Sequence, residues 1–415
     1  MINLSNKLNK FIFVLVFIIS VLLVTKGLKF VGWSSFSLLS TLRYDGMFLL
    51  PIAALILKGK IMNKNYMRCR KFVSYFIFAC FFTFLLRILL YGGGLGYGLE
   101  CNLFVAFIFC VYYILHYVSV SEELLIKSLT IIGVAVFVIQ VFQQINPSMA
   151  MFSTYTEEMR EEIGLSSDYI TGQRNGLYRF IPLAANVPVF LSCYYFSKML
   201  NDTNIKNMVL TLVFVASMYF MLTRMFMICT GICFLYILLS KKRRNKSHVS
   251  SIAIILLIIT SLIVYGDVLF SDLFSSTNSD IEYSSTARMQ SLPFIFGKAF
   301  SNPILFITGH GYPSILWKWG ADLGYWYNDL GIFGQVFPYG IIWVGVYFYL
   351  VYFLLIKMKK KLPTYIKAYT FGLFCICFMM TSYANRLETT LLWCIILYIS
   401  DLYIGNSDKT EHNAI

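Results

Sequence analysis

Charged residues are scarce in this chain: Asp, Glu, Lys and Arg together make up only 13% of its 415 residues. A soluble domain carries roughly 25% charged residues, so this chain has too little polar surface to face water on every side. Hydrophobic residues make up 58% of the chain, and its mean hydropathy is +0.71. The composition excludes an ordinary soluble domain and predicts an all-α, polytopic integral membrane protein.

Motifs of soluble enzymes are absent as well. There is no Walker loop, no glycine pattern for dinucleotides and no His-Glu-x-x-His sequence. Nearly all of the ten cysteines lie in apolar runs, which argues against a disulfide framework, and Cys375 and Cys377 lack zinc-ligand spacing. We therefore expect no metal and no cofactor.

Long apolar runs recur along the whole chain. A membrane span needs about 20 mostly apolar residues. We predict spans near residues 11–31, 38–57, 72–91, 99–119, 124–142, 180–198, 207–223, 225–240, 250–268, 331–356, 365–383 and 389–405. The first run, which begins at Phe11 after Lys7 and Lys10, resembles a signal peptide. Because no small-x-small cleavage site precedes Lys26, we interpret it as an uncleaved span.

The placement of positive charge predicts the topology. Basic clusters fall at residues 58–71, 241–244 and 357–361, in gaps that share one side of the membrane. Lys and Arg favour the cytoplasmic side, so both termini are expected in the cytoplasm, with about 12 spans between them. Although the net charge is +14, these clusters serve topology, and we expect no nucleic-acid partner.

Two predicted outer loops are much longer than the other connections. They cover residues 143–178 and 267–330 within a single transmembrane domain, 1–415. Loops of this length are usually functional or disordered. The second loop is rich in Trp, Tyr and Gly, which argues for order, and we predict a helix in it from Ala287 to Phe300. Its three tryptophans are Trp317, Trp319 and Trp326.

Arg is concentrated on the predicted outer side, whereas Lys dominates the inner gaps. The planar guanidinium group suits paired recognition of phosphates and carboxylates. An Arg at membrane depth is costly unless it is paired or wetted, which makes it a functional candidate. Pairing with local acids such as Glu157 and Glu161, or with lipid head groups, is the alternative. The candidates are Arg174, Arg179, Arg224, Arg288 and Arg386.

One histidine lies on the outer side, in Gly309-His310-Gly311. It is either a turn residue between glycines or a group that handles protons. The nearby Asp280-Ile-Glu282 has the acid-x-acid spacing used in metal-dependent glycosyl transfer. Because two acids in a Ser-rich stretch readily arise by chance, we do not interpret this pair as a metal site.

The outer segments resemble a known family. Ser285-Thr-Ala-Arg288, then Pro303, Gly309-His310-Gly311 and Asp329-Leu-Gly331-Ile-Phe-Gly334 before a span are similar to the Wzy-type O-antigen polymerases, which share their plan with the O-antigen ligases. Thr223-Arg224 and Arg174-Asn-Gly176-Leu also resemble positions of that family. The motifs are short and spread along the chain, so their order and sidedness carry the likeness. Where the ligases have a loop His before the next span, this chain has Asn328-Asp329, which favours the polymerases.

The resemblance implies a GT-C-like plan and metal-independent glycosyl transfer at the periplasmic face of the bacterial inner membrane. The donor would be a growing glycan on undecaprenyl diphosphate, and the acceptor a lipid-linked repeat unit. Arg288 and Arg224 would stabilise the diphosphate leaving group, and Asp329 or His310 would orient or accept the proton of the acceptor.

The same resemblance implies further site residues and partners, and two alternative functions stay open. Substrate-binding roles would fall to Arg174, Arg179, Arg386, Trp317, Trp319 and Trp326. A chain-length regulator and a flippase would be partners, besides the bilayer itself. An O-antigen ligase and a lipid-linked oligosaccharide flippase remain the alternative functions.

Overall fold

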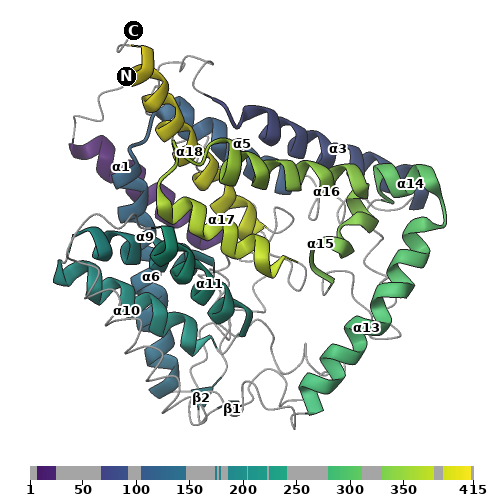
Figure 1. Ribbon diagram of the computed structural model, residues 1–415, viewed down its shortest axis with the longest axis horizontal. Helices are drawn as coiled ribbons and strands as arrows, with labels where there is room; N and C mark the ends of the chain where they lie inside the picture. The colour runs from purple at the N-terminus through teal and green to yellow at the C-terminus, as the bar shows by residue number, and fades with distance from the viewer. Residues whose placement is uncertain are drawn as a thin grey trace.

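The computed structural model describes residues 7–24, 67–91, 104–145, 173–174, 177–178, 186–202, 204–221, 224–240, 279–310, 330–377 and 387–412. Helices make up nearly all of the regular structure in these ranges (Figure 1). The helices of the first half are α1 (Lys7–Val24), α3 (Arg70–Tyr91), α5 (Phe104–Val118), α6 (Glu122–Ile145), α9 (Asn186–Asn201), α10 (Ile205–Phe220) and α11 (Arg224–Ser240). Those of the second half are α13 (Ser279–Phe300), α14 (Pro303–Thr308), α15 (Gly331–Gly334), α16 (Val336–Tyr352), the π-helical turn η6 (Phe353–Lys357), α17 (Thr364–Ile376) and α18 (Leu387–His412).

The strands are minimal. β1 (Gln173–Arg174) and β2 (Leu177–Tyr178) form one antiparallel ladder, in which Gln173 faces Tyr178 and Arg174 faces Leu177. Within the described ranges the chain is therefore all-α apart from this short hairpin, as its composition predicts.

A helix lies at every predicted span that falls within the described residues, and the spans at 38–57 and 250–268 lie outside them. Two stretches, Glu122–Phe142 and Val336–Lys357, are long and apolar enough to cross a membrane. The predicted span 331–356 is not one continuous helix. It begins as the separate helix α15, and Gly340 then interrupts α16 with a φ of 79°. The loop helix also begins earlier than predicted, at Ser279 instead of Ala287.

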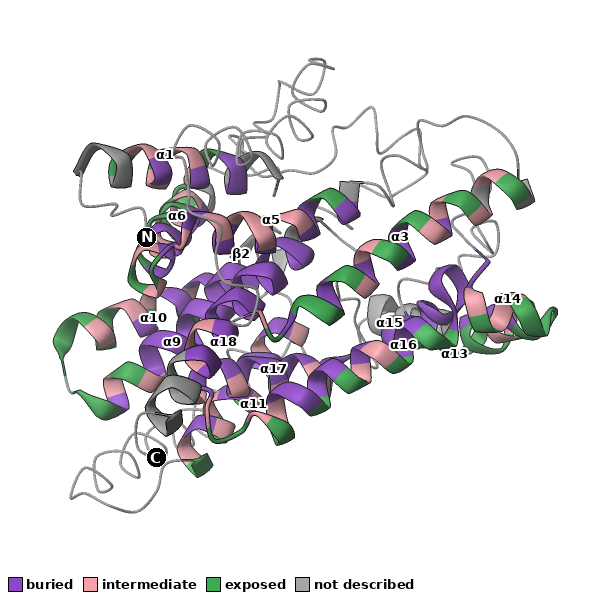
Figure 2. Ribbon diagram, turned by 90° about the horizontal axis from the view of Figure 1, so that it is seen from above, coloured by how far each residue is buried: buried purple, intermediate pink, exposed green. Residues whose placement is uncertain are grey.

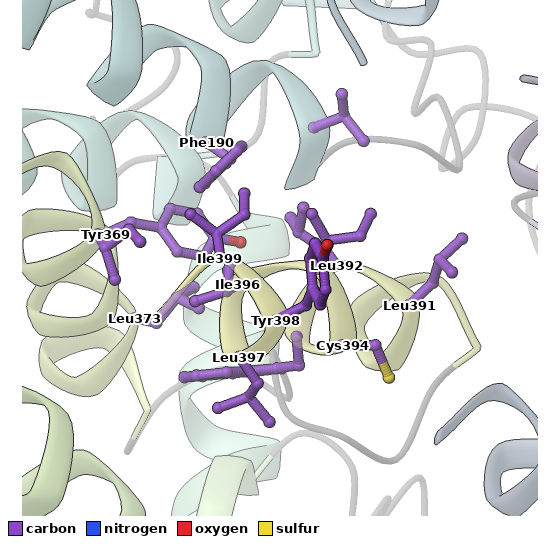
Figure 3. Close-up of a cluster of buried hydrophobic side chains, with 14 of the residues drawn as sticks. Phe190, Tyr369, Leu373, Leu391, Leu392, Cys394, Ile396, Leu397, Tyr398 and Ile399 are labelled. Carbon is purple, nitrogen blue, oxygen red and sulfur yellow. The ribbon is translucent and has the colours of Figure 1, made fainter. Parts of the chain in front are cut away.

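The centre of the hydrophobic core is built on α18. Its side chains pack against Phe190 of α9 and against Tyr369 and Leu373 of α17 (Figure 3). Buried residues are concentrated in α9, α17 and α18, whereas α13 and α14 carry many exposed ones (Figure 2). Burial of apolar surface stabilises this core by roughly 25 cal/mol per Å².

Several hydroxyl groups inside the apolar helices are satisfied locally. Thr83 donates to the carbonyl of Ala79 at 2.7 Å, and Ser400 donates to that of Ile396 at 2.8 Å. A buried hydroxyl without a partner would cost free energy, so this back-bonding lets polar residues occupy apolar helices.

The relative directions of neighbouring helices can be read from their contacts. α3 and α16 are antiparallel, since Phe72 contacts Tyr349 while Phe76 contacts Trp343. α5 and α18 are parallel: Cys394 bonds to Ile108, and Asp401, further along α18, bonds to Tyr112, further along α5.

The directions of the helices around α9 follow from their contacts in the same way. Phe190 contacts Tyr369 while Tyr194 contacts Tyr365, so α9 and α17 are antiparallel. Tyr195 bonds to Thr130 while Gly133 lies against Leu191, so α6 and α9 are antiparallel as well. All of these directions agree with the alternation expected from the placement of basic residues.

Candidate functional site

The end of the predicted outer loop is docked tightly onto α16. Gly309, which follows α14, and Gly340, within α16, both have positive φ, at 94° and 79°. A Cβ at Gly309 would lie 2.4 Å from the carbonyl oxygen of Pro338, and one at Gly340 would lie 2.2 Å from that of Ile307. Two backbones therefore meet where only glycine fits. We call residues 303–310 with 330–340 the outer junction.

Local sequence explains how α14 forms at this junction. Asn302 caps the helix, because its side-chain oxygen accepts from the backbone N–H of Ile304 at 3.0 Å and of Leu305 at 3.4 Å. Pro303 occupies the first turn, where its missing N–H costs nothing. A cap, a proline and a closing glycine thus start and stop this short helix.

His310 joins the two segments of the outer junction to each other and to α13. Its backbone N–H donates to the carbonyl of Phe337 at 2.8 Å, and its ring stacks on the ring of Phe337 with centroids 4.6 Å apart. Its Nε2 lies 3.3 Å from the carbonyl oxygen of Ala299 on α13. The residue is only 4% exposed, and burial lowers its pKa below the ordinary 6.5. A neutral ring that donates from Nε2 has Nδ1 as its proton-accepting nitrogen.

The junction is expected to loosen in acid. Because the pKa of His310 is lower in the folded protein than in the unfolded chain, the unfolded chain binds more protons as pH falls below about 6.5. Stability is therefore full above that pH and is lost below it, by at most about 1.4 kcal/mol per pH unit for one proton. Hydrogen exchange of residues 303–310, corrected for intrinsic rates, should be faster at pH 5.5 than at pH 7.5 in the wild type. In His310→Phe, which keeps an aromatic ring but cannot titrate, the dependence should vanish; its persistence would contradict this assignment.

Three of the arginines predicted to lie in the site belong to helices or strands that the structure describes, and for these only the backbone is described. Arg288 lies within α13, Arg224 is the first residue of α11, and Arg174 pairs with Leu177 in the hairpin. A cation at the start of a helix opposes the helix dipole, so Arg224 does not stabilise α11. The remaining predicted site residues lie outside the described ranges: Asp329, Arg179, Trp317, Trp319, Trp326 and Arg386.

Contacts hold the start of α11 beside the ends of two other helices. Thr230 of α11 donates to the sulfur of Met218 on α10 at 2.8 Å. Ser217 of α10 donates to the side-chain oxygen of Gln140 on α6 at 2.6 Å, and the amide of Gln140 donates to the Ser217 carbonyl at 3.2 Å. The backbone of Arg224 is therefore fixed relative to the predicted outer ends of α6 and α10.

Gln335 was not singled out from the sequence. It lies between α15 and α16 and is buried, yet among the described residues neither its side-chain oxygen nor its nitrogen has a hydrogen-bond partner. An unpaired buried amide costs about 1–3 kcal/mol, which calls for a reason to keep it. Its only signal in the sequence is a polar residue directly after Gly331-Ile-Phe-Gly334.

A second polar cluster lies at the opposite, predicted inner ends of the helices. The carboxylate of Asp401 accepts from the hydroxyl of Tyr112, from the backbone N–H of Cys69 at 3.0 Å and from His116, whose Nε2 is 3.2 Å away. The His116 ring also contacts the ring of Tyr398. Asp401, Tyr112 and His116 are all buried. We call Asp401, Tyr112, His116 and Cys69 the Asp401 cluster.

Glu122 forms a similar arrangement nearby on α6. It accepts from the hydroxyl of Tyr365 on α17 at 2.6 Å and from that of Tyr403 on α18 at 2.7 Å. Both carboxylates thus tie α18 to other helices through tyrosines. In the part of the chain that the structure describes, no group of three or more His, Cys, Asp or Glu residues is placed to hold a metal ion.

No protein-family model, curated protein or solved structure matches the chain. The functional argument therefore rests on the chain's own residues. Among the described residues, two polar regions carry this argument: the outer junction, beside α13, and the Asp401 cluster at the opposite helix ends.

Proposed function

We propose that the chain is a multi-pass inner-membrane glycosyltransferase that polymerises lipid-linked repeat units at the periplasmic face. The growing glycan would be transferred from undecaprenyl diphosphate to the acceptor repeat unit, without a metal ion. The low charge content, the sided placement of Lys and Arg and the matching helix directions support the membrane topology.

The observation that carries the proposal is the docking of α13 and α14 onto α16. His310 bonds to α13 and stacks on Phe337, and the glycine pair locks α14 to the kink of α16. The helix that bears Arg288 is therefore held by a built junction. Preorganised cations are what a leaving diphosphate requires, because their orientation then costs nothing during the reaction.

The proposed reaction balances without a further reactant. The acceptor hydroxyl oxygen attacks the anomeric carbon, the bond from that carbon to the diphosphate oxygen breaks, and undecaprenyl diphosphate leaves with the bonding electrons. The hydroxyl proton passes to a base, for which Asp329 and His310 are the candidates. His310 meets one requirement of this role, since its lowered pKa keeps the ring neutral near pH 7.

Arg224 is the candidate for a second contact with the diphosphate. The free backbone N–H groups at the start of a helix favour anions, and an arginine in the same place adds a full positive charge. Since that charge is unfavourable for α11 itself, an anionic ligand explains it better than helix stability does.

Replacing either arginine tests the enzyme assignment. In Arg288→Ala and Arg224→Ala, chain growth should slow roughly 10²-fold, as when one charge-stabilising donor is removed. Surface polysaccharide separated by size should then lose its long chains but keep single-repeat chains. The Lys variants should recover part of the length, because they restore charge without the planar fork.

Lys298→Ala is a matched control, since Lys298 is an exposed cation on the same helix as Arg288. It should leave chain length unchanged at equal protein abundance. Normal chain length in both arginine variants would refute the assignment of these two residues. Loss of every repeat, including single ones, would point to a ligase or a flippase.

A flippase remains the second candidate because of the Asp401 cluster. A buried carboxylate beside a histidine is typical of transporters that bind protons within the membrane. Transport of labelled lipid-linked repeat units in proteoliposomes separates the two functions: a polymerase should not move them across the bilayer, whereas a flippase should.

A further inference from the structure

One face of α13 and α14 is apolar although it is exposed. Met289 is 76% exposed, Phe300 is 56% exposed and Ile304 is 70% exposed. The face comprises Met289, Leu292, Phe296, Phe300, Ile304 and Ile307, and we call it the α13–α14 apolar face. An apolar surface of this extent would be costly in water, and such patches mark interaction sites.

The neighbouring side of α13 is already buried, which shows that this face is not merely a misplaced core. Ile295 and Ala299 are each 1% exposed and pack with Leu330 and Phe337. The helix therefore already has a buried face against the outer junction, and the apolar face is a second one. Lys298 and Ser301 are both exposed and form a polar edge on the far side of α13 from the apolar face.

Aromatic rings tie the apolar face to the junction. The rings of Phe296 and Phe300 lie 5.7 Å apart, and Phe300 stacks on Phe306 of α14 at 4.5 Å. Phe296 also contacts Phe333 of α15 at 6.2 Å. The face is thus a fixed surface that runs across three helices rather than a set of independent side chains.

The surface continues onto a helix of membrane-spanning character. α14 packs on α16, whose residues Ile341 and Ile342 are also exposed directly after the Gly340 kink. The stretch Val336–Lys357 is long and apolar enough to span a bilayer. On the membrane assignment, lipid covers the exposed side of α16, and α14, which packs on α16, lies beside the same environment. Figure 2 shows the exposed residues of α13 and α14 beside one end of α16.

We propose that α13 and α14 are embedded in the outer surface of the bilayer, with the apolar face against acyl chains and Lys298 among the head groups. A helix with one apolar face and Lys on its polar side is typical of this interfacial position. The inference requires only that the chain lies in a membrane, not that it polymerises glycans. If the proposed function also holds, the backbone of Arg288, next to Met289, lies at head-group depth, where the diphosphate of a lipid-linked substrate sits.

An environment-sensitive fluorophore on introduced cysteines tests this placement in the full-length protein, reconstituted in phosphatidylglycerol and phosphatidylethanolamine nanodiscs. Met289→Cys and Ile304→Cys report on the apolar face, and Lys298→Cys and Ser301→Cys on its polar edge. Phe78→Cys, exposed on the predicted span α3, is the control for insertion, and the wild type gives background labelling. We expect brominated lipids to quench the first pair and Phe78→Cys, and aqueous iodide to quench the second pair.

The other outcomes overturn the inference in distinguishable ways. If iodide quenches the Met289 and Ile304 probes as strongly as the Lys298 probe while Phe78→Cys is lipid-quenched, the face lies in water. If neither quencher reaches these probes in discs that hold two copies, but iodide reaches them in discs that hold one, a second copy covers the face. If Phe78→Cys is not quenched by lipid, the membrane assignment itself fails and this inference fails with it.

Discussion

Asp401→Ala is expected to unfold at a clearly lower temperature than the wild type, with a loss of about 3 kcal/mol or more. The substitution removes the acceptor of Tyr112, Cys69 and His116, and each buried donor left without a partner costs about 1–3 kcal/mol. Heating the detergent-solubilised protein and measuring the fraction that remains monodisperse would give the shift. Such unfolding is commonly irreversible, so all variants should be heated at the same rate.

Ser400→Ala is the matched control. Ser400 is also buried and is the neighbour of Asp401, but its hydroxyl bonds only within its own helix, to the carbonyl of Ile396. It should therefore lose far less stability. If Asp401→Ala and Ser400→Ala melt together with the wild type, the Asp401 cluster does not stabilise the protein.

An apolar replacement of the three side chains of the cluster separates structural from functional roles. Asp401→Leu combined with His116→Leu and Tyr112→Phe removes the acceptor together with both side-chain donors, and leaves only the backbone N–H of Cys69 without its partner. Stability should then recover relative to Asp401→Ala. Normal polysaccharide in this triple variant would argue against the flippase candidate, because a proton-binding acid would be gone.

Gly340→Ala is the second change with a large expected effect. Its Cβ would lie 2.2 Å from the carbonyl oxygen of Ile307 and 2.6 Å from the nitrogen of Gly309, at a φ of 79°. Left-handed backbone costs a residue other than glycine about 1–3 kcal/mol, and overpacking adds about 1–3 kcal/mol. We expect α14 to separate from α16, with faster hydrogen exchange at residues 303–310 and, under the proposed function, loss of long chains.

Gly345→Ala provides the control on the same helix. Apart from the adjoining backbone of its own helix, no described atom lies within 4 Å of a Cβ at Gly345, and its φ is not in the left-handed region. Ala favours helices over Gly by about 0.5–1 kcal/mol, so this variant should be neutral or slightly more stable. Equal hydrogen exchange in the two alanine variants would contradict the tight glycine contact.

The helices could be predicted from sequence because apolar runs of membrane length are a local signal. The break of the predicted span 331–356 was missed, since a kink at Gly340 depends on its contact with Ile307, which the pattern of one run does not contain. The start of α13 was missed for a different reason. Its first turns, Ser279 to Thr286, are polar and Ser-rich and look like a loop.

From the sequence, the candidate site could be predicted only as a set of residue types on the outer side of the membrane. That pattern pointed to Arg288, Arg224 and His310, but it could not show that His310 bonds to Ala299 and stacks on Phe337. The Asp401 cluster was missed altogether, because its members are far apart in sequence and each alone resembles an ordinary polar residue near a span end. Cys69 and Asp401 are separated by 332 positions.

That separation also has a consequence for biosynthesis. Membrane helices are synthesised and inserted in order, and the backbone N–H of Cys69 at the start of α3 finds its acceptor only when α18 has been made. Tyr112 and His116 bond to Asp401 of the same helix, and Glu122 bonds to its Tyr403, so these contacts also form only after α18 is made. Contacts between distant parts of a chain form late, so early helices stay incompletely assembled until α18 has left the ribosome. Nascent chains that stop before residue 401 should therefore be prime substrates for membrane quality-control proteases.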